Sequence, residues 1–221
     1  METREAVKNR RSIRKFLLKP VPEKMIQEII SDALWSPSWG NTQPWEITVL
    51  TEDAMKRFME KNREAVMTGK APNPDVSVPE DWPDTHKSRY KDVGRRVLNS
   101  LDIAREDVQA RMDYYGRMFA CFEAPALILL SVDKALSLEY AMLDIGIFVQ
   151  SLCLLAIDKG LGTAILAASI NYPDILRESF SLPEDKHIII GIAIGWPDPD
   201  APENQFERTR GKIEEFVHWI K

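Results

Sequence analysis

Apolar residues recur at helical spacing in the first quarter of the chain. In PEKMIQEIISDALWS (22–36), positions 25, 26, 29, 30, 33 and 34 are apolar and charged residues lie between them, which predicts an amphipathic helix that ends before Pro37. A short helix is predicted over Glu2–Asn9. WEITVLT (Trp45–Thr51) is rich in β-branched residues and predicts a strand, and a longer helix follows over Glu52–Val66.

Three apolar runs of strand length lie in the second half of the chain. They are ALILLSVD (126–133), GTAIL (162–166) and HIIIGIAIGW (187–196). Helical patterns are predicted over Lys87–Phe122 and over Tyr172–Phe180. Gly191 and Gly195, inside the last predicted strand, indicate close approach of another backbone or of a ligand.

The stretch LEYAMLDIGIFVQSLCLLAIDKG (138–160) is apolar on nearly every side. A helix of this kind belongs in the middle of a core or at a subunit interface, and in a chain of this size we expect a homodimer built around it. Asp144, Gln150 and Ser151 interrupt the run, so it is a poor membrane span and no membrane association is expected.

The order of these elements predicts an α+β fold with a small mixed sheet flanked by helices. No internal repeat or linker divides the chain, so residues 1–221 are expected to form one domain. The segment of about 68–86 is proline-rich and has little apolar pattern. Such a segment is typical of a lid or of a tolerated surface insertion.

Composition narrows the classes of function. The 221 residues are 44% hydrophobic and 29% charged, and the formal net charge is -5. An acidic chain is a poor match for a nucleic-acid binder, although the basic stretch 10–24 keeps that alternative open. Cys121 and Cys153 lie far apart among apolar neighbours, as reduced core thiols do, and no signal-peptide pattern is present. A cytoplasmic protein is therefore expected.

Common catalytic and metal-binding motifs are missing from the sequence. There is no HExxH, no GxSxG, no GxxxxGK[ST] and no Cys/His spacing typical of a metal site, so no metal is expected. In contrast, RRSIRKF (10–16) concentrates positive charge in an acidic chain. Arginines and hydroxyls of this kind can bind a phosphate, and a chain without a reactive side chain can rely on a cofactor for its chemistry.

Four motifs, in order, resemble those of the FMN-dependent nitroreductase superfamily, and the resemblance covers essentially the whole chain. They are RRSIRKF (10–16), SPSWGNTQPW (36–45), KGLGTAIL (159–166) and RTRGKIEEFVHW (208–219). The insertion PEDWPD (79–84) is similar to the nitrobenzoate-reductase-like branch. The resemblance implies a nitroreductase-like fold, an intertwined homodimer and two FMN sites at its interface.

The resemblance also implies a role for individual residues. Arg10 and Ser12 would hold the FMN phosphate, Arg11 would add further contacts, and Arg14 would approach the N1–C2 edge of the flavin ring. The remaining cofactor-binding residues would be Arg208 and Arg210 at the phosphate, Pro37, Ser38 and Asn41 from the second subunit, and Leu166, Ala167 and Ala168 along the ring and N5. No protein side chain is expected to be catalytic. Trp39, Tyr114, Tyr115, Phe119 and Phe122 could line the substrate side, but aromatic residues at such spacing are more often core.

The implied activity is that of an FMN-dependent NAD(P)H oxidoreductase of the nitroreductase type, with NADH or NADPH as electron donor. The enzyme would work by ping-pong hydride transfer and reduce a small-molecule acceptor, either a nitroaromatic compound or a quinone. Two alternatives stay open. One is another flavin reaction on the same scaffold, such as enone reduction, reductive dehalogenation or flavin fragmentation by an oxygenase. The other is a non-enzymatic flavin-binding redox sensor.

Overall fold

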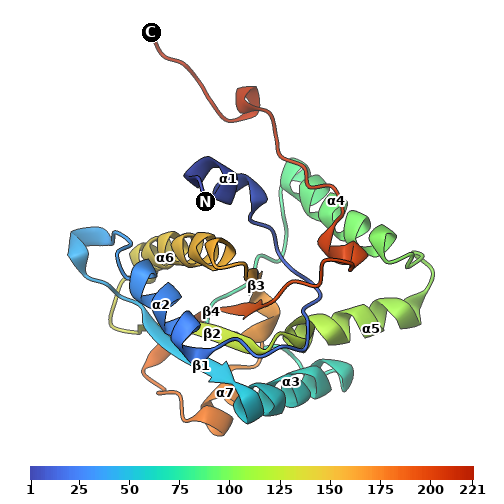
Figure 1. Cartoon of the computed structure of the whole chain (residues 1–221), viewed down its shortest axis with the longest axis horizontal. Helices are drawn as coiled ribbons and strands as arrows, with labels where there is room; N and C mark the ends of the chain where they lie inside the picture. The colour runs from blue at the N-terminus through green and yellow to red at the C-terminus, as the bar shows by residue number, and fades with distance from the viewer.

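The computed structural model describes all 221 residues, and its centre is a four-stranded sheet with helices on both faces (Figure 1). The strands are β1 (Glu46–Thr51), β2 (Ala126–Asp133), β3 (Gly162–Leu166) and β4 (Lys186–Gly195), in the order β1-β2-β4-β3. All three pairings are antiparallel, so the expectation of a mixed sheet was wrong for these strands. The one parallel pairing is a single bridge between Ser12 and Thr163.

Seven helices surround this sheet. They are α1 (Thr3–Asn9), α2 (Glu23–Ala33), α3 (Glu52–Met67), α4 (Asp84–Ser100), α5 (Val108–Phe119), α6 (Leu138–Asp158) and α7 (Pro173–Phe180). The α+β class is confirmed, and most predicted bounds agree to within a few residues. The predicted helical stretch Lys87–Phe122 is in fact two helices, α4 and α5. The break contains Asp102, which has a left-handed φ of 53°, and Asp107, which caps α5 by accepting a hydrogen bond from the Ala110 N–H (2.9 Å).

Both faces of the sheet are buried. Along β2, Leu127 and Leu129 contact the core shared with α3, α5 and α7, whereas Ile128 and Leu130 contact the core shared with α2 and α6. Alternate side chains of a strand point to opposite faces, so a strand that is covered on both sides must be apolar throughout. This explains why ALILLSVD shows no alternation in sequence.

The helix α6 is long and apolar enough to cross a membrane by composition, but it packs on the sheet and on α2. Ile145, Phe148 and Leu152 are buried on one of its faces. Its other face leaves Leu143 61% exposed. The chain after β4 crosses the N-terminal segment and then extends away from the body as a tail (Figure 1).

Candidate functional site

The arginine-rich segment Arg10–Phe16 lies along the edge of the sheet, beside β3. The Ile13 N–H donates to the carbonyl oxygen of Thr163 (2.9 Å), and the side chains of Ile13 and Phe16 are buried. A Cβ on Gly162 would lie 2.4 Å from the Ile13 side chain, so only glycine allows the segment to pack this closely. The two apolar side chains anchor the segment, whereas Arg10, Arg11 and Arg14 are only partly buried.

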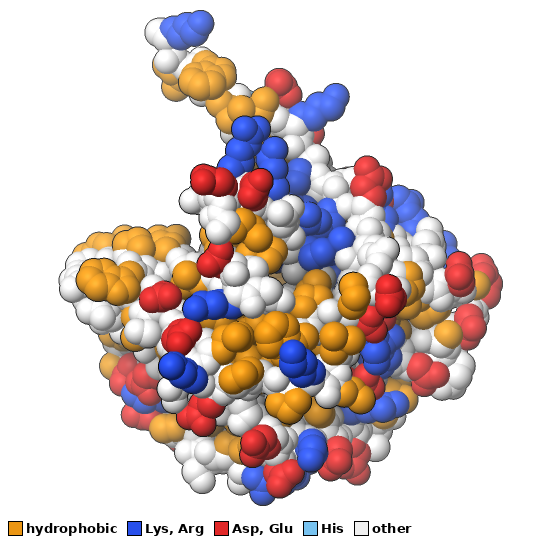
Figure 2. Space-filling model, in the orientation of Figure 1, with side chains coloured by type: hydrophobic (Ala, Val, Ile, Leu, Met, Phe, Trp, Pro, Cys, Tyr) orange, Lys and Arg blue, Asp and Glu red, His pale blue; other side chains and the backbone are white.

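The C-terminal segment covers the same arginines. The Arg11 guanidinium donates to the carbonyl oxygen of Phe206 (2.9 Å), and the Phe206 ring centroid lies 5.2 Å from the Arg11 Cζ and 5.3 Å from the Arg14 Cζ. Arg208 donates to the carbonyl oxygen of Arg10. The two ends of the chain therefore form one basic surface, and Figure 2 shows Lys and Arg side chains gathered where the tail leaves the body.

A cavity of about 180 Å³ opens within this basic surface. It is lined by Arg10, Arg11, Ser12, Arg14, Val93, Arg96, Phe206, Glu207, Arg208, Thr209 and Arg210. Glu207 is the one carboxylate among six arginines, and it pairs with Arg96 (3.2 Å). We call this space the phosphate cavity, because the other five guanidinium groups form no ion pair and, with a hydroxyl beside them, suit a dianion.

Burial and mutual repulsion lower the pKa values of two arginines of the phosphate cavity. Burial, followed by the positive charges of Arg208 and Arg14, lowers the pKa of Arg11. Burial, followed by Arg10 and Arg210, lowers the pKa of Arg208. The Nε of Arg11 is buried and has no hydrogen-bond partner. A bound anion in the cavity would relieve the repulsion among these arginines.

A second cavity of about 370 Å³ adjoins the first, and Ser12 and Arg14 line both. Eleven of its fourteen lining residues are apolar. Besides Ser12 and Arg14, its wall contains Val78, Tyr90, Tyr114, Met118, Phe119, Phe122, Ala164, Ile165, Leu166, Ala167, Ala168 and Asn171. We call it the ring cavity, because an apolar space lined by aromatic side chains suits a flat ring system.

Aromatic residues on and after α5 form one wall of the ring cavity. Tyr114, Phe119 and Phe122 line it, although Phe119 and Phe122 also belong to the core. Burial raises the pKa of Tyr114, and the nearby positive charge of Arg14 opposes that shift. Phe122 has a left-handed φ of 54° between two other left-handed residues. The remaining aromatic candidates, Trp39 and Tyr115, do not line the cavity.

Two buried polar side chains support the opposite wall, where β3 ends at Leu166. The Ser169 hydroxyl donates to the Leu166 carbonyl oxygen (2.6 Å). The side-chain amide of Asn62, on α3, donates to the carbonyl oxygens of Ala168 (3.1 Å) and Phe119 (2.6 Å). Asn62 is fully buried and so connects the two walls of the ring cavity. Nothing in its sequence context distinguishes it from other polar helix residues.

The structure brings together nine of the twelve predicted site residues. Arg10, Arg11, Ser12, Arg14, Arg208 and Arg210 line the phosphate cavity, and Leu166, Ala167 and Ala168 line the ring cavity. The remaining three, Pro37, Ser38 and Asn41, line neither cavity. They belong to a turn next to α6, where the Trp39 N–H donates to Asp144 (3.1 Å).

Sequence reasoning missed several residues of the two cavities. In the phosphate cavity these are Val93 and Arg96, both from α4. In the ring cavity they are Tyr90, also from α4, and Val78, from the irregular segment. These residues carried no local signal, because α4 reaches the site only through tertiary packing. The irregular segment and α4 thus contribute to the walls of the two cavities.

Comparison with known proteins identifies the family and the fold. The model of the nitroreductase family matches residues 7–196. The chain is 31% identical over 220 residues to a chloronitrobenzene nitroreductase of Comamonas testosteroni, covering 98% of this chain and 96% of the relative. It is 29% identical to a 4-nitrobenzoate reductase of Pseudomonas putida over 214 residues, 97% and 93% of the two chains. It also resembles the solved structure of the FMN and NADPH-dependent nitroreductase NfnB from Sphigopyxis sp. strain HMH, with a TM-score of 0.95, 28% identity and complete coverage of both chains.

Proposed function

The chain belongs to the nitroreductase family, and from this premise we propose that it is an FMN-dependent NAD(P)H oxidoreductase that reduces nitroaromatic compounds. The observation that carries the proposal is the joined pair of cavities. Six arginines and a serine line one, and apolar and aromatic residues line the other. An organic phosphate that carries a flat ring matches this arrangement.

FMN, when bound, supplies the redox chemistry by accepting a hydride from NADH or NADPH and delivering it to the acceptor. The residues of the chain bind and orient the cofactor. Arg10, Arg11, Ser12, Arg208 and Arg210 would hold the phosphate. The backbone of Leu166–Ala168 would lie along the ring, and Arg14, at the junction of the two cavities, would place positive charge beside it. Such charge favours the reduced cofactor.

We further propose that the enzyme is a homodimer in which α6 packs against its copy. Leu143 is 61% exposed on the free face of α6. On the same face, a Cβ added to Gly146 would have no atom within 4 Å. The tail also carries unpartnered apolar side chains, with Trp219 81% and Ile220 98% exposed. In such a dimer, the turn that carries Pro37, Ser38 and Asn41 would complete the cofactor site of the other subunit.

The substrate class rests on the relatives and on the wall of the ring cavity. The relatives named above are reductases of chloronitrobenzene and of 4-nitrobenzoate, which are small aromatic nitro compounds. Tyr114, Met118 and Phe122 offer apolar surface of matching character. Quinones, which are also flat and apolar, are a second class of acceptor. We expect the protein in the cytoplasm, as one domain over residues 1–221, with both cysteines as free thiols.

The test is the visible absorption spectrum of the purified protein, before and after anaerobic addition of NADPH or NADH. A flavin band that bleaches on addition and returns with nitrobenzene or a quinone supports the proposal. A flavin band that does not bleach with either donor would favour a redox sensor instead. A colourless protein that also fails to take up added FMN would overturn the assignment of both cavities.

A further inference from the structure

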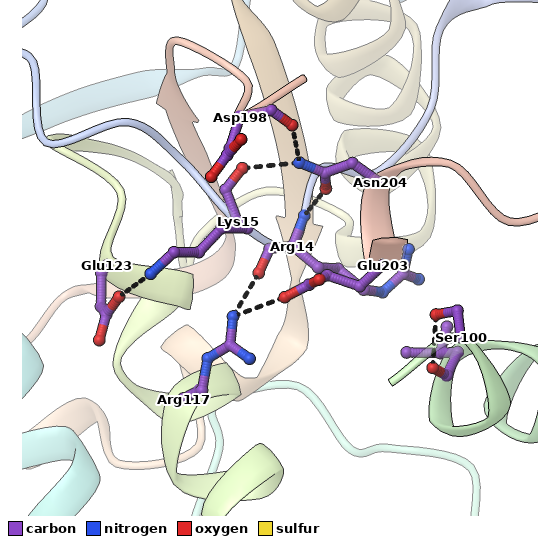
Figure 3. Close-up of polar contacts among 9 residues, drawn as sticks. Arg14, Lys15, Ser100, Arg117, Glu123, Asp198, Glu203 and Asn204 are labelled. Carbon is purple, nitrogen blue, oxygen red and sulfur yellow. Dashed lines mark hydrogen bonds and ion pairs between the residues drawn. The ribbon is translucent and has the colours of Figure 1, made fainter. Parts of the chain in front are cut away.

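The backbone of Arg14 is held from both sides by side chains (Figure 3). Its N–H donates to the Oδ1 of Asn204 (2.8 Å), and its carbonyl oxygen accepts from the Nη2 of Arg117 (3.1 Å). Asn204 comes from the segment after β4, whereas Arg117 comes from α5. Two elements far apart in sequence therefore fix a single residue of the phosphate-binding segment.

Asn204 uses its whole side-chain amide in this contact. Besides accepting from Arg14, it donates from Nδ2 to the carbonyl oxygens of Lys15 (2.7 Å) and Asp198 (3.0 Å). The residue is only 6% exposed. Asn204 thus holds the peptide group before Arg14 and the carbonyl group of Lys15, and Arg117 holds the peptide group between them, which leaves little freedom for the backbone of Arg14.

Arg117 is itself fixed by an ion pair. Its Nη2 lies 2.8 Å from the Oε1 of Glu203, whose side chain is only 4% exposed. Glu203 directly precedes Asn204. The same turn therefore holds the Arg14 N–H directly, through Asn204, and the Arg14 carbonyl oxygen indirectly, through Glu203 and Arg117. Without Arg117 the buried carboxylate of Glu203 would have no compensating charge, and this favours the paired position of Arg117 in the folded state.

The guanidinium charge of Arg14, unlike the charges of its two cationic neighbours, is not paired with a carboxylate. Lys15 pairs with Glu123 (2.8 Å) and Arg117 pairs with Glu203, but Arg14 forms no ion pair. Its Nη1 donates only to the carbonyl oxygen of Ser12 (3.2 Å). Of three neighbouring cations, the one that lines both cavities is thus the one whose charge is not neutralised by the protein.

We propose that Asn204 and the Arg117–Glu203 pair are positioning residues for the redox function: they hold the backbone of Arg14 so that its unpaired guanidinium stays at the junction of the phosphate and ring cavities. This inference rests on the proposed binding of FMN. The reduction potential of the bound flavin would then depend on Asn204, Arg117 and Glu203, none of which lines either cavity.

The experiment measures the midpoint potential of FMN bound to the holoenzyme in two charge-neutral variants. Asn204→Leu removes all three hydrogen bonds. Arg117→Met/Glu203→Gln removes the ion pair without changing the net charge, and it decides the question if Asn204→Leu does not fold. We expect each to lower the equilibrium constant for flavin reduction three- to tenfold, or roughly 15–30 mV for a two-electron couple, in the same direction as Arg14→Ala.

A double-mutant cycle separates positioning from general structural damage. In an Arg14→Ala background, Asn204→Leu should cause no further change in potential, because the charge that it positions is already gone. Gln205→Leu is the matched control. Gln205 is the exposed neighbouring amide and donates to the Pro199 carbonyl oxygen rather than to Arg14, so its variant should keep the wild-type potential.

The outcomes distinguish this inference from the proposed function. A wild-type potential in the positioning variants, or an equal shift in the Arg14→Ala background, overturns the positioning role while FMN binding stands. An unchanged potential in Arg14→Ala with FMN bound overturns the role of Arg14 itself. Failure of the wild-type protein to bind FMN refutes the proposed function on which the inference rests.

Discussion

The guanidinium of Arg208 donates a hydrogen bond to the carbonyl oxygen of Arg10, 198 positions earlier in the chain. A second nitrogen of the same group donates to the carbonyl oxygen of Lys8 (2.6 Å). Arg208 therefore ties the end of α1 to the C-terminal segment and at the same time places its charge at the phosphate cavity. A single side chain both shapes this site and contributes to its charge.

Replacement of Arg208 should weaken FMN binding. Arg208→Ala removes one charge and two hydrogen bonds, and charge-assisted bonds contribute about 1.5–3 kcal/mol each. We expect the dissociation constant for FMN to rise roughly ten- to a hundredfold, measured by fluorescence titration of the apoprotein. The dissociation constant of the Arg208→Lys variant should lie between those of the wild-type protein and Arg208→Ala, because lysine keeps the charge but loses the planar, bidentate guanidinium group.

Arg105→Ala is the matched control for loss of one arginine charge. Arg105 is exposed and lines neither cavity, so its removal should leave FMN affinity unchanged. Equal affinities of the Arg208→Ala variant and the wild-type protein would contradict the assignment of the phosphate cavity.

Gly191 should not tolerate even alanine. A Cβ there would lie 2.2 Å from the Ser169 Oγ and 3.1 Å from the Leu127 Cδ1. Since Ser169 is buried and supports the end of β3, it would have to move, and we expect Gly191→Ala to lower the free energy of unfolding by about 1–3 kcal/mol in urea. Adding Ser169→Gly should restore part of that loss.

Gly94→Ala provides the comparison within a helix. No atom lies within 4 Å of a Cβ built at Gly94, and this glycine is inside α4, so alanine there should stabilise the protein by about 0.5–1 kcal/mol. If both alanine variants were equally stable, the close contact between Gly191 and Ser169 would be refuted.

Local patterns were sufficient for most elements of the fold. GTAIL and ALILLSVD match β3 and β2 residue for residue, because short apolar runs bounded by turn residues are typical of strands. Gly191 and Gly195 do allow a close approach, but the predicted partner, another backbone or a ligand, was wrong: the side chain of Ser169 lies against the first and that of Pro125 against the second. The separation of α4 from α5 was missed, since no glycine or proline marks it.

The site could be predicted only in part, and for a physical reason. Arg10 and Arg208 belong to recognisable motifs, so the resemblance to a family named them. Arg117 and Asn204 are an ordinary helix residue and an ordinary turn residue, and their contact with Arg14 exists only once distant segments have packed. Pairings of this kind depend on tertiary structure, and no spacing in the sequence encodes them.

Both thiols should be unreactive in the folded protein. Burial raises the pKa of Cys121 to about 12 and also raises the pKa of Cys153. Ellman's reagent at ~pH 8 should therefore find no thiol in the native state and two in denaturant, because only an exposed thiolate reacts. Rapid reaction of the native protein would show that at least one cysteine is accessible.

The shifted pKa of Cys121 also makes stability depend on pH. The folded state binds the proton of the Cys121 thiol more tightly than the unfolded chain does. The stability that this thiol contributes is thus fully present below about pH 9, and it is lost as pH rises from there toward 12. Cys121→Ala should show a shallower loss of unfolding free energy over this alkaline range than the wild-type protein. Identical slopes would mean that the thiol is not protected.

The free face of α6 should hold two subunits together. Leu143 is 61% exposed there, and a glutamate in its place would put two like charges near each other across a symmetric interface. We expect Leu143→Glu to convert the dimer to a monomer in light scattering coupled to size-exclusion chromatography, and to weaken FMN binding as well, since Pro37, Ser38 and Asn41 would no longer reach the other subunit's cofactor. Val108→Glu is the matched control, because Val108 is an equally apolar residue, 70% exposed, on α5. A monomeric wild-type protein that binds FMN tightly would refute both the interface and the shared site.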